Sequence, residues 1–404
     1  MANLDIESIR SDFPILSKEI NGNRLIYLDS AATSQKPKQV IDGIKYFYEN
    51  LNANPLRSIH TLAEKAAAAY NDSREKIAKF INAERDEIVF TRNATEAINL
   101  VSFALPFRKG DRILTTLMEH HSNLLPWMRL RESGVTVDLA GVNDNNELDM
   151  KHFDDIPKDT KLVTVTHASN VTGTINDVES IIKKSHDAGA LVMVDAAQSA
   201  PHMKIDVKKM DVDFLAFSGH KMLGPMGIGV LYVKKDVAGK LRPFLTGGEM
   251  IKEVKLDSVV YSDFPTVFEA GTQNIEGAYG LSLAVDYLDK IGMKNVEEYE
   301  RLLTSHLYKR SKELHNVDVY SGKSRNFNGI FSFNVRGLHS HDTAYLLDKK
   351  GIAVRSGFHC AQPLIEEKIN ASGVARASLY IYNTFEEVDR FIDELNSIAV
   401  KYGR

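Results

Sequence analysis

The 404-residue chain contains one cysteine, Cys360, whose neighbours favour a reactive thiol. A single thiol cannot form an intramolecular disulfide, and alone it cannot build a cysteine-rich metal site. Arg355 and His359 precede it, and cationic neighbours lower the pKa of a thiol. Gly357 and Pro363 predict a loop, where reactive groups often lie. A buried cysteine that packs as a small hydrophobe is equally compatible with this segment.

A second candidate for chemistry is Lys221, which follows the end of a predicted strand. The apolar run 214–217 predicts a buried strand, and Ser218, Gly219 and His220 separate it from Lys221. A glycine-rich turn and a second apolar run, 230–233, come next. Desolvation of a lysine at such a position lowers its pKa and makes it a usable amine nucleophile or base. An ordinary solvated loop lysine remains the alternative.

A carboxylate, Asp195, ends another predicted strand at 191–194. In an open parallel sheet, ligands bind outside the carboxyl ends of the strands, so Asp195 and Lys221 are expected at the same edge. An amine and a carboxylate at one site match pyridoxal phosphate chemistry. The lysine forms a Schiff base with the aldehyde, and the carboxylate keeps the pyridine nitrogen protonated. Asp195 is also compatible with a helix N-cap.

Several motifs in the same order resemble the SUF-type cysteine desulfurase and selenocysteine lyase branch of the class V aminotransferase group. They include residues 27–32, 93–99, 213–221, 354–363 and 376–384, so the resemblance covers nearly the whole chain. It implies an α/β fold, that of the fold-type I pyridoxal-phosphate-dependent transferases. Such a fold has a large domain with a mostly parallel, seven-stranded type of sheet and a smaller α+β C-terminal domain.

The resemblance also assigns roles to individual residues. Catalytic roles fall on Lys221, Cys360 and His120, with His121 supporting. Substrate contacts fall on Arg376, which clamps the carboxylate, and on Asn170 and Arg355. Contacts to pyridoxal 5'-phosphate are expected from Lys221, Asp195, Gln198, Ser218, His220, Thr95, His120, Asn170 and Thr272. Thr272 is expected to reach the phosphate of the neighbouring subunit, which implies a homodimer.

The activity implied is conversion of L-cysteine to L-alanine, with the sulfur held on Cys360 as a persulfide. That sulfur is expected to pass to an acceptor protein for iron–sulfur cluster assembly, and L-selenocysteine is a possible second substrate. Other enzymes that use this cofactor remain open, because an aminotransferase or a dedicated selenocysteine lyase would keep Lys221 and Asp195 without needing Cys360. A nicotinamide-dependent dehydrogenase is disfavoured, since no G-x-G-x-x-G turn opens the first strand–helix unit.

The chain departs from the family pattern at four places. The usual His-Arg-Gly-x-His reads Leu56-Arg57-Ser58-Ile59-His60, and the usual Gly-His-His-Cys has Phe358 in place of its first His. Ala94 stands where a second Thr is common, and Gln273 stands where the family has Pro. All four changes leave the lysine, the aspartate and the cysteine in place.

The elements that position these residues follow from the hydrophobic pattern. Short apolar strands alternate with helical patterns from about 88 to 233, which is typical of a parallel α/β sheet. Further helices are expected at 63–81, 281–291, 296–314 and 385–402, and further strands at 329–334 and 352–354. We expect residues 21–285 to form the large domain and 286–404 the small domain. Residues 1–20 should pack on the small domain, with the site in the cleft between domains.

Composition narrows the function classes. The chain has a net charge of −4, with 43% hydrophobic and 26% charged residues. It shows no basic patch with interleaved aromatics, so nucleic acid is not an expected partner. No apolar run approaches the ~20 residues that cross a bilayer, and the acidic N-terminus lacks a signal sequence, so a cytoplasmic location is expected. His120 and His121 are adjacent and would point to opposite faces of a strand, so no metal is expected.

Overall fold

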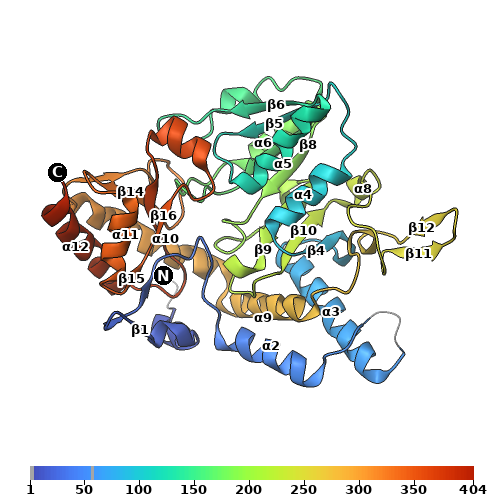
Figure 1. Ribbon diagram of the computed structural model, residues 1–404, viewed down its shortest axis with the longest axis horizontal. Coiled ribbons are helices and arrows are strands. Elements are labelled where there is room, and N and C mark those ends of the chain that lie inside the picture. The colour runs from blue at the N-terminus through green and yellow to red at the C-terminus, as the bar shows by residue number, and fades with distance from the viewer. Residues whose placement is uncertain (1–3, 56–58) are drawn as a thin grey trace.

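A seven-stranded sheet forms the centre of the larger part of the molecule (Figure 1). The computed structural model describes residues 4–55 and 59–404, so Leu56 and Ser58, two of the departures noted above, lie outside the described residues. The strand order is β4-β10-β9-β8-β7-β5-β6. The strands are β4 (Ile88–Thr91), β5 (Arg112–Thr116), β6 (Thr136–Ala140), β7 (Thr160–Thr166), β8 (Leu191–Asp195), β9 (Phe214–Ser218) and β10 (Gly229–Val233).

Only β10 reverses direction in this sheet, because it pairs antiparallel with both β9 and β4 while the other pairs are parallel. The predicted mostly parallel, seven-stranded sheet of an α/β fold is therefore confirmed. Every residue of β9 is buried, as expected for a strand covered on both faces. Parallel pairing carries the ends of β7, β8 and β9, and with them Asp195 and Ser218, to one edge.

Helices cover both faces of this sheet. On one face, α4 (Ala94–Ala104) and α5 (Leu125–Arg129) pack with alternate strand residues such as Ile113 and Met193. On the other face, α6 (Val178–Asp187) and α9 (Ile275–Ile291) pack on residues such as Val192 and Leu215. The helices α2 (Lys38–Asn50) and α3 (Thr61–Phe80) lie against α9, and two short helices complete this part, α7 (Val207–Met210) and α8 (Lys235–Ala238).

The C-terminal part has an α+β arrangement and lies at the left of Figure 1. Its antiparallel sheet has the order β13-β14-β17-β16. The strands are β13 (Val317–Val319), β14 (Ile330–Val335), β16 (Arg355–Gly357) and β17 (Val374–Ser378), and the helices are α10 (Met293–Arg310), α11 (Ser340–Asp348) and α12 (Phe385–Tyr402). A π-helical segment, Leu364–Ile369, follows the cysteine loop.

The N-terminal segment contacts this C-terminal part. It contains α1 (Ile6–Ser11), β1 (Glu19–Ile20), β2 (Asn23–Arg24) and β3 (Ile26–Tyr27), and β3 pairs in parallel with β15 (Ile352–Ala353). The buried Arg10 side chain forms an ion pair with Glu387 of α12 at 2.7 Å. The domain limits at 20 and 285 stay predictions, and α9 runs without a break across the second of them.

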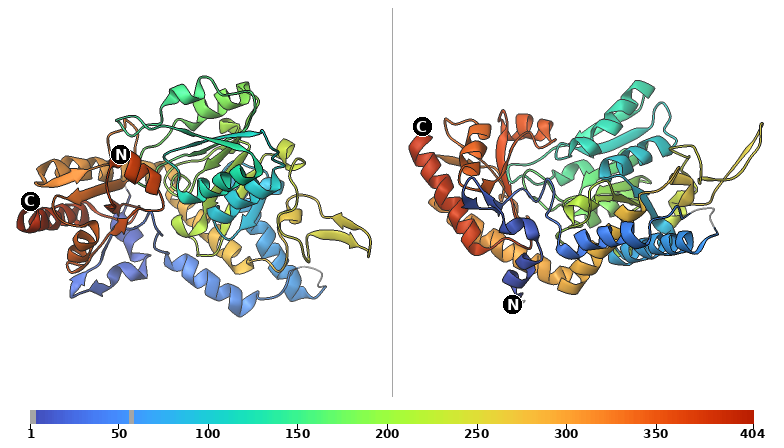
Figure 2. Two further views of the ribbon diagram at one scale, coloured as in Figure 1. Left: turned by 45° about the horizontal axis from the view of Figure 1, so that its top comes forward. Right: turned by 60° about the horizontal axis from the view of Figure 1, so that its bottom comes forward.

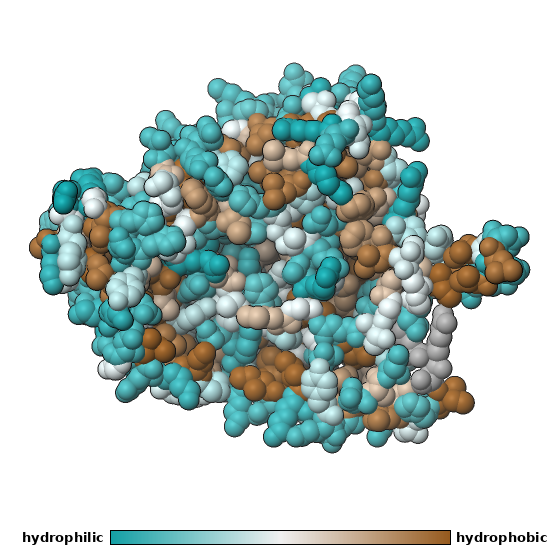
Figure 3. Space-filling view, viewed as in Figure 1, coloured by the Kyte–Doolittle hydropathy of each residue, from teal (hydrophilic) through white to brown (hydrophobic). Residues whose placement is uncertain are grey.

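A two-stranded hairpin, β11 (Ile251–Val254) and β12 (Val259–Tyr261), projects from the body of the chain (Figure 2). Half of the exposed residues at 252–261 are apolar, and Figure 3 shows a hydrophobic surface there, at the right of the molecule. These apolar residues are Val254, Leu256, Val259, Val260 and Tyr261. Among the described residues, no helix is long and apolar enough to span a membrane.

Candidate active site

A cavity of about 490 Å³ lies between the carboxyl ends of the central strands and the segment that carries β16 and β17. It brings together the side chains predicted from both halves of the sequence. Its lining includes Thr95, His120, Asn170, Asp195, Gln198, Ser218, His220, Lys221, Arg355, Cys360 and Arg376. Thr272 is absent from it and lines a separate cavity of about 330 Å³, together with residues such as Arg92 and Phe244.

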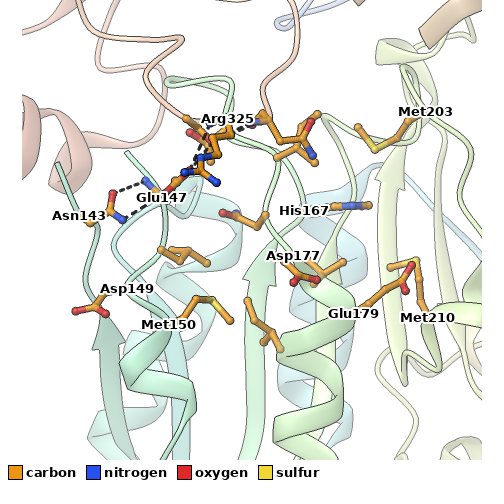
Figure 4. A pocket seen from close by; sticks show the side chains of 18 of the residues that line it. Asn143, Glu147, Asp149, Met150, His167, Asp177, Glu179, Met203, Met210 and Arg325 are labelled. Atoms are coloured by element: carbon orange, nitrogen blue, oxygen red, sulfur yellow. Dashed lines mark hydrogen bonds between the residues drawn. The ribbon is translucent and has the colours of Figure 1, made fainter. Parts of the chain in front are cut away.

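A larger cavity, about 1000 Å³, is built from other residues (Figure 4). It is lined by acidic, amide and methionine side chains, among them Asn143, Glu147, Asp149, Met150 and Met203. None of the residues predicted to act lies in it. The chemistry of the lining, and not the volume, therefore marks the smaller cavity as the candidate site. In the described part of the chain, no group of three or more His, Cys, Asp or Glu side chains is arranged to hold a metal.

Lys221 ends the short 3₁₀ turn Gly219–Lys221 that follows β9. Burial lowers the pKa of its amine to about 8, and the nearby Asp195 carboxylate opposes that shift. Gly219 permits this turn, since a Cβ at residue 219 would lie 2.9 Å from Cγ2 of Ile228 and 3.1 Å from the Ile228 carbonyl oxygen. The neutral amine is thus accessible near physiological pH, as a nucleophile or base requires.

Asp195 is 4% exposed at the end of β8. Its Oδ1 accepts a hydrogen bond from the main-chain N of Ala197 at 2.9 Å, and a turn, not a helix, follows. Burial raises the pKa of this carboxyl. A buried carboxyl of raised pKa gains most from a cationic partner, which fits a protonated pyridine nitrogen.

His120 adjoins a buried acid that the sequence analysis did not identify. Burial lowers the pKa of His120 to about 3, with Lys221 contributing, so the ring is neutral. Its Nδ1 accepts from the main-chain N of Ser122 at 3.1 Å, which places the proton on Nε2. Burial raises the pKa of the neighbouring Glu119 to about 8, and Asp195 adds to that shift. Glu119 accepts hydrogen bonds from Thr116, Asn123 and the main-chain N of Thr166.

Donors suited to a phosphate gather at the start of α4. Ser218 Oγ accepts from the main-chain N of Ala94 at 2.8 Å, and the Thr95 hydroxyl lies 2.7 Å from that of Ser122. Gly229 lets β10 approach this turn, since a Cβ there would lie 2.5 Å from Cα of Asn93. A helix N-terminus with nearby hydroxyls is a ready anion site.

Cys360 is exposed in a loop held by contacts from the large part of the chain. The main-chain N of His121 donates to the Cys360 carbonyl at 2.6 Å, and His121 Nε2 accepts from the main-chain N of Gln362 at 3.2 Å. Asn170 Nδ2 donates to the His359 carbonyl at 2.8 Å. His359 and Cys360 both have positive φ, 49° and 55°, so the loop needs these restraints.

One part of the sequence argument for this thiol is corrected. His359 was considered a cationic neighbour, but burial lowers its pKa to about 3, with Arg376 contributing. Its Nε2 faces the Val374 carbonyl at 3.0 Å and therefore carries the proton of a neutral ring. The positive charges near Cys360 are Arg355, Arg376 and Lys221, all of which line the same cavity.

Arg376 is 2% exposed on β17 and is anchored by two groups. One terminal nitrogen donates to the Asn170 carbonyl at 2.8 Å, and the other lies 3.4 Å from Asp29 Oδ1. Among the described residues, the Nε of Arg376 has no hydrogen-bond partner. Arg355 pairs with the other oxygen of Asp29 at 3.7 Å. Asp29, which the sequence analysis did not single out, thus contacts both arginines at the cavity.

The residues of this cavity fit pyridoxal phosphate. The Oε1 of Gln198 is buried and has no hydrogen-bond partner in the described part of the chain, while its Nε2 donates to the Ala31 carbonyl at 2.8 Å. The same space is lined by hydrogen-bond donors for a phosphate, by a lysine whose pKa is lowered, and by a carboxyl that favours a cationic partner. This set matches the phosphate, the aldehyde and the ring nitrogen of the cofactor.

The turn around Thr272 is closed by Gln273, the residue that replaces the family's proline. Its Nε2 donates to the carbonyls of Glu269 and Gly271 at 2.7 and 2.9 Å. The buried Glu269 carboxylate in turn pairs with Arg74 at 2.6 Å. The departure at 273 therefore leaves a well-connected turn, with Thr272 exposed on its surface.

Comparisons with known proteins agree with this geometry. The aminotransferase class-V family model matches residues 26–391. A probable cysteine desulfurase of Synechocystis is 48% identical over 96% of this chain and 94% of its own length. A cysteine desulfurase of Haloferax volcanii is 42% identical, covering 98% of this chain and 97% of its own. The apo structure of a cysteine desulfurase from Thermococcus onnurineus NA1 superposes with a TM-score of 0.94 at 41% identity, over 99% of this chain and 100% of that one.

Proposed function

On the premise that this chain, a member of the class-V aminotransferase family, is a cysteine desulfurase that uses pyridoxal phosphate, we propose roles for three residues. The reaction is carried by Lys221, Cys360 and Arg376. One observation supports the assignment above the others. One cavity is lined by a lysine of lowered pKa, a buried carboxyl, an arginine whose Nε is unpaired among the described residues, and the chain's sole thiol. These groups are spread over residues 195–376 of the sequence.

The cofactor supplies an electron sink that accepts the charge left when the substrate loses its Cα proton. Thr95, Ser218, His220, Gln198 and Asp195 would hold it, the first three at the phosphate and Asp195 at the ring nitrogen. The neutral His120, whose Nε2 carries a proton, would lie at its ring.

The chain's own residues orient the substrate and move its protons. Arg376 and Asn170 bind the carboxylate of L-cysteine, with Arg355 closing the outer side of the same site. The Nζ of Lys221, neutral for part of the time near pH 7.5 because its pKa is about 8, takes the Cα proton. The His120 Nε2 is placed to return or relay a proton.

Sulfur transfer uses the thiolate of Cys360. Its Sγ attacks the sulfur of the bound cysteine, so that an S–S bond forms while the substrate C–S bond breaks. The electron pair of the broken bond stays with carbon, which is protonated, and the products are L-alanine and a Cys360 persulfide. No external oxidant or reductant is needed for this step. An acceptor protein of iron–sulfur cluster assembly then takes the terminal sulfur from the exposed loop.

The second part of the proposal is a homodimer. Thr272 lies on an exposed turn outside its own chain's cavity, as expected if it serves the phosphate of a neighbouring subunit. The apolar side chains of the β11–β12 hairpin would be covered by a second copy (Figure 3). Sedimentation equilibrium should give a dimer, and Thr272→Ala should weaken cofactor binding without unfolding the chain.

Location and domain limits complete the proposal. A reactive thiol persists in a reducing compartment, which supports the cytoplasm. Residues 1–20 serve as a segment on the small domain, 21–285 as the large domain and 286–404 as the small domain. The ion pair of Arg10 with Glu387 supports the first of these assignments.

Two measurements test the proposed roles. Borohydride reduction of the holoenzyme should fix the cofactor to the peptide that contains Lys221, and Lys221→Ala should lose both the label and turnover. L-Alanine should form from L-cysteine, faster when a candidate acceptor removes the persulfide. Labelling of any other lysine would contradict the role given to Lys221.

A further inference from the structure

A second buried lysine, Lys36, lies behind the turn that presents Lys221. Its Nζ donates to the carbonyl of His220 at 2.8 Å and to the carbonyl of Ser34. Lys36 does not line the cavity, and no step of the proposed reaction uses it. Its target, the His220 carbonyl, belongs to the peptide group that ends at the Lys221 nitrogen.

The His220 carbonyl oxygen receives an unusual number of donors. Besides Lys36, the main-chain N and the hydroxyl of Ser34 lie 3.0 and 3.1 Å from it, and the Thr33 hydroxyl lies at 3.1 Å. The Ser34 hydroxyl also accepts from the main-chain N of Leu223 at 2.8 Å, on the far side of the turn. Residues 33–36 therefore hold the turn before and after Lys221.

Among these donors, Lys36 alone can carry a positive charge, and its burial opposes that charge. Burial lowers the pKa of Lys36 to about 7, and within the described residues no carboxylate forms an ion pair with it. Lys36 and Lys221 each help to lower the pKa of His220. A cation buried without a carboxylate disfavours folding, so fold stability alone does not account for it.

We propose that Lys36 is a positioning residue for Lys221. Its ammonium fixes the His220 carbonyl and thereby the main chain from which the Lys221 side chain enters the cavity. The inference rests on the role proposed for Lys221 and adds a residue that touches neither cofactor nor substrate. A charge-assisted hydrogen bond of this kind typically contributes enough to change a rate about tenfold to hundredfold.

The test compares three substitutions at one position. Lys36→Met removes the donors and the charge, Lys36→Gln keeps a neutral donor, and Lys36→Arg keeps a cation. Lys204→Met is the matched control, because Lys204 donates to a main-chain carbonyl, that of Phe80 at 2.9 Å, away from the site. For each full-length chain, cofactor is removed and the rate of covalent capture of added pyridoxal phosphate is followed by visible absorbance. The pH titration of the holoenzyme's visible band and the thermal unfolding midpoint are also recorded.

We expect Lys36→Met to capture the cofactor about tenfold to hundredfold more slowly and to shift the pH titration of the visible band. Lys36→Arg should recover most of the rate and Lys36→Gln part of it, while Lys204→Met should match wild type. The unfolding midpoint of cofactor-free Lys36→Met should be equal to or above that of wild type, because a buried cation is removed.

Three results would overturn the inference. One is an unchanged capture rate and pH titration in Lys36→Met. Another is a slower capture rate in Lys36→Met that parallels a lower unfolding midpoint, together with an equally slow rate in Lys36→Arg. That pattern would make Lys36 a structural anchor. If Lys36→Met does not fold, equal rates for the Arg and Gln variants would also contradict it. Failure of the proposed function is seen separately, as a borohydride label on a lysine other than Lys221 in the wild-type enzyme.

Discussion

Replacing Lys221 by methionine should stabilise the cofactor-free chain at neutral pH, and the gain should disappear as the pH rises. The pKa of this lysine falls from 10.5 to about 8 in the folded chain because its amine is buried. A methionine of similar length removes the buried charge and keeps the apolar stem.

The sign and the size follow from proton linkage. Below pH 8 the folded and unfolded chains both bind the proton, so the cost of burying the charge is constant and fully present. Between pH 8 and 10.5 only the unfolded chain binds it, so the stability of wild type rises with pH over this window. The 2.5-unit difference, 10.5 minus 8, corresponds to about 3 kcal/mol, and partial contact of the amine with the cavity reduces it to about 2–3 kcal/mol.

Urea unfolding of the cofactor-free proteins at a series of pH values measures the effect. The free energy of unfolding of Lys221→Met minus that of wild type should be about 2–3 kcal/mol near pH 7 and should approach zero near pH 10.5. Lys209→Met is the control, since Glu179 raises the pKa of Lys209 and its contribution is lost only above pH 10.5. A difference for Lys221→Met that stays constant across this range, or a variant less stable than wild type at pH 7, would refute the burial argument.

Three further substitutions probe the other groups of the site. Asp195→Asn should keep the fold but slow Cα proton removal by about tenfold to hundredfold, because a buried charged partner of the ring nitrogen is lost. A turnover rate close to that of wild type would show that Asp195 only closes its turn. Asp29→Asn should raise KM for L-cysteine by about tenfold with a smaller effect on kcat, since Arg376 loses a partner; an unchanged KM would remove Asp29 from substrate binding. His121→Ala should slow persulfide formation on Cys360 while leaving cofactor capture unchanged, because its ring accepts from Gln362 in the cysteine loop; equal losses of both would instead indicate a general disturbance of the site.

The groups at strand ends could be predicted from the sequence, because a parallel sheet fixes where those ends lie. Asp195 ends β8 and Lys221 follows β9, and the apolar runs that precede both residues are typical of buried strands. Helix and strand positions also agreed within a few residues, as for α12 at 385–402 and β14 at 330–335. Cys360 and Arg376 lie far along the chain, and only the resemblance connected them to the same cavity.

The groups that position these residues could not be predicted. Asp29 orients Arg376 across almost the whole length of the chain, and Lys36 acts on a main-chain carbonyl, which no side-chain pattern reports. Glu119 precedes a histidine of the expected motif, yet its importance comes from complete burial beside Asp195. The charge of His359 was misjudged for the same reason, because burial, and not sequence proximity, sets its protonation.

The central claim is that Cys360 accepts the sulfur of L-cysteine, and Cys360→Ala tests it most directly. Rates are measured side by side on L-cysteine and L-selenocysteine, with acceptor present and free thiols excluded, and the wild-type persulfide is trapped by alkylation and mapped. Selenium leaves its substrate more readily than sulfur and needs less help from a thiolate. The account predicts that Cys360→Ala keeps its cofactor, its fold and substantial selenocysteine lyase activity but loses nearly all cysteine desulfuration. In the wild type, the alkylation label is expected on the peptide that contains Cys360. Undiminished sulfur release from L-cysteine by Cys360→Ala would contradict it.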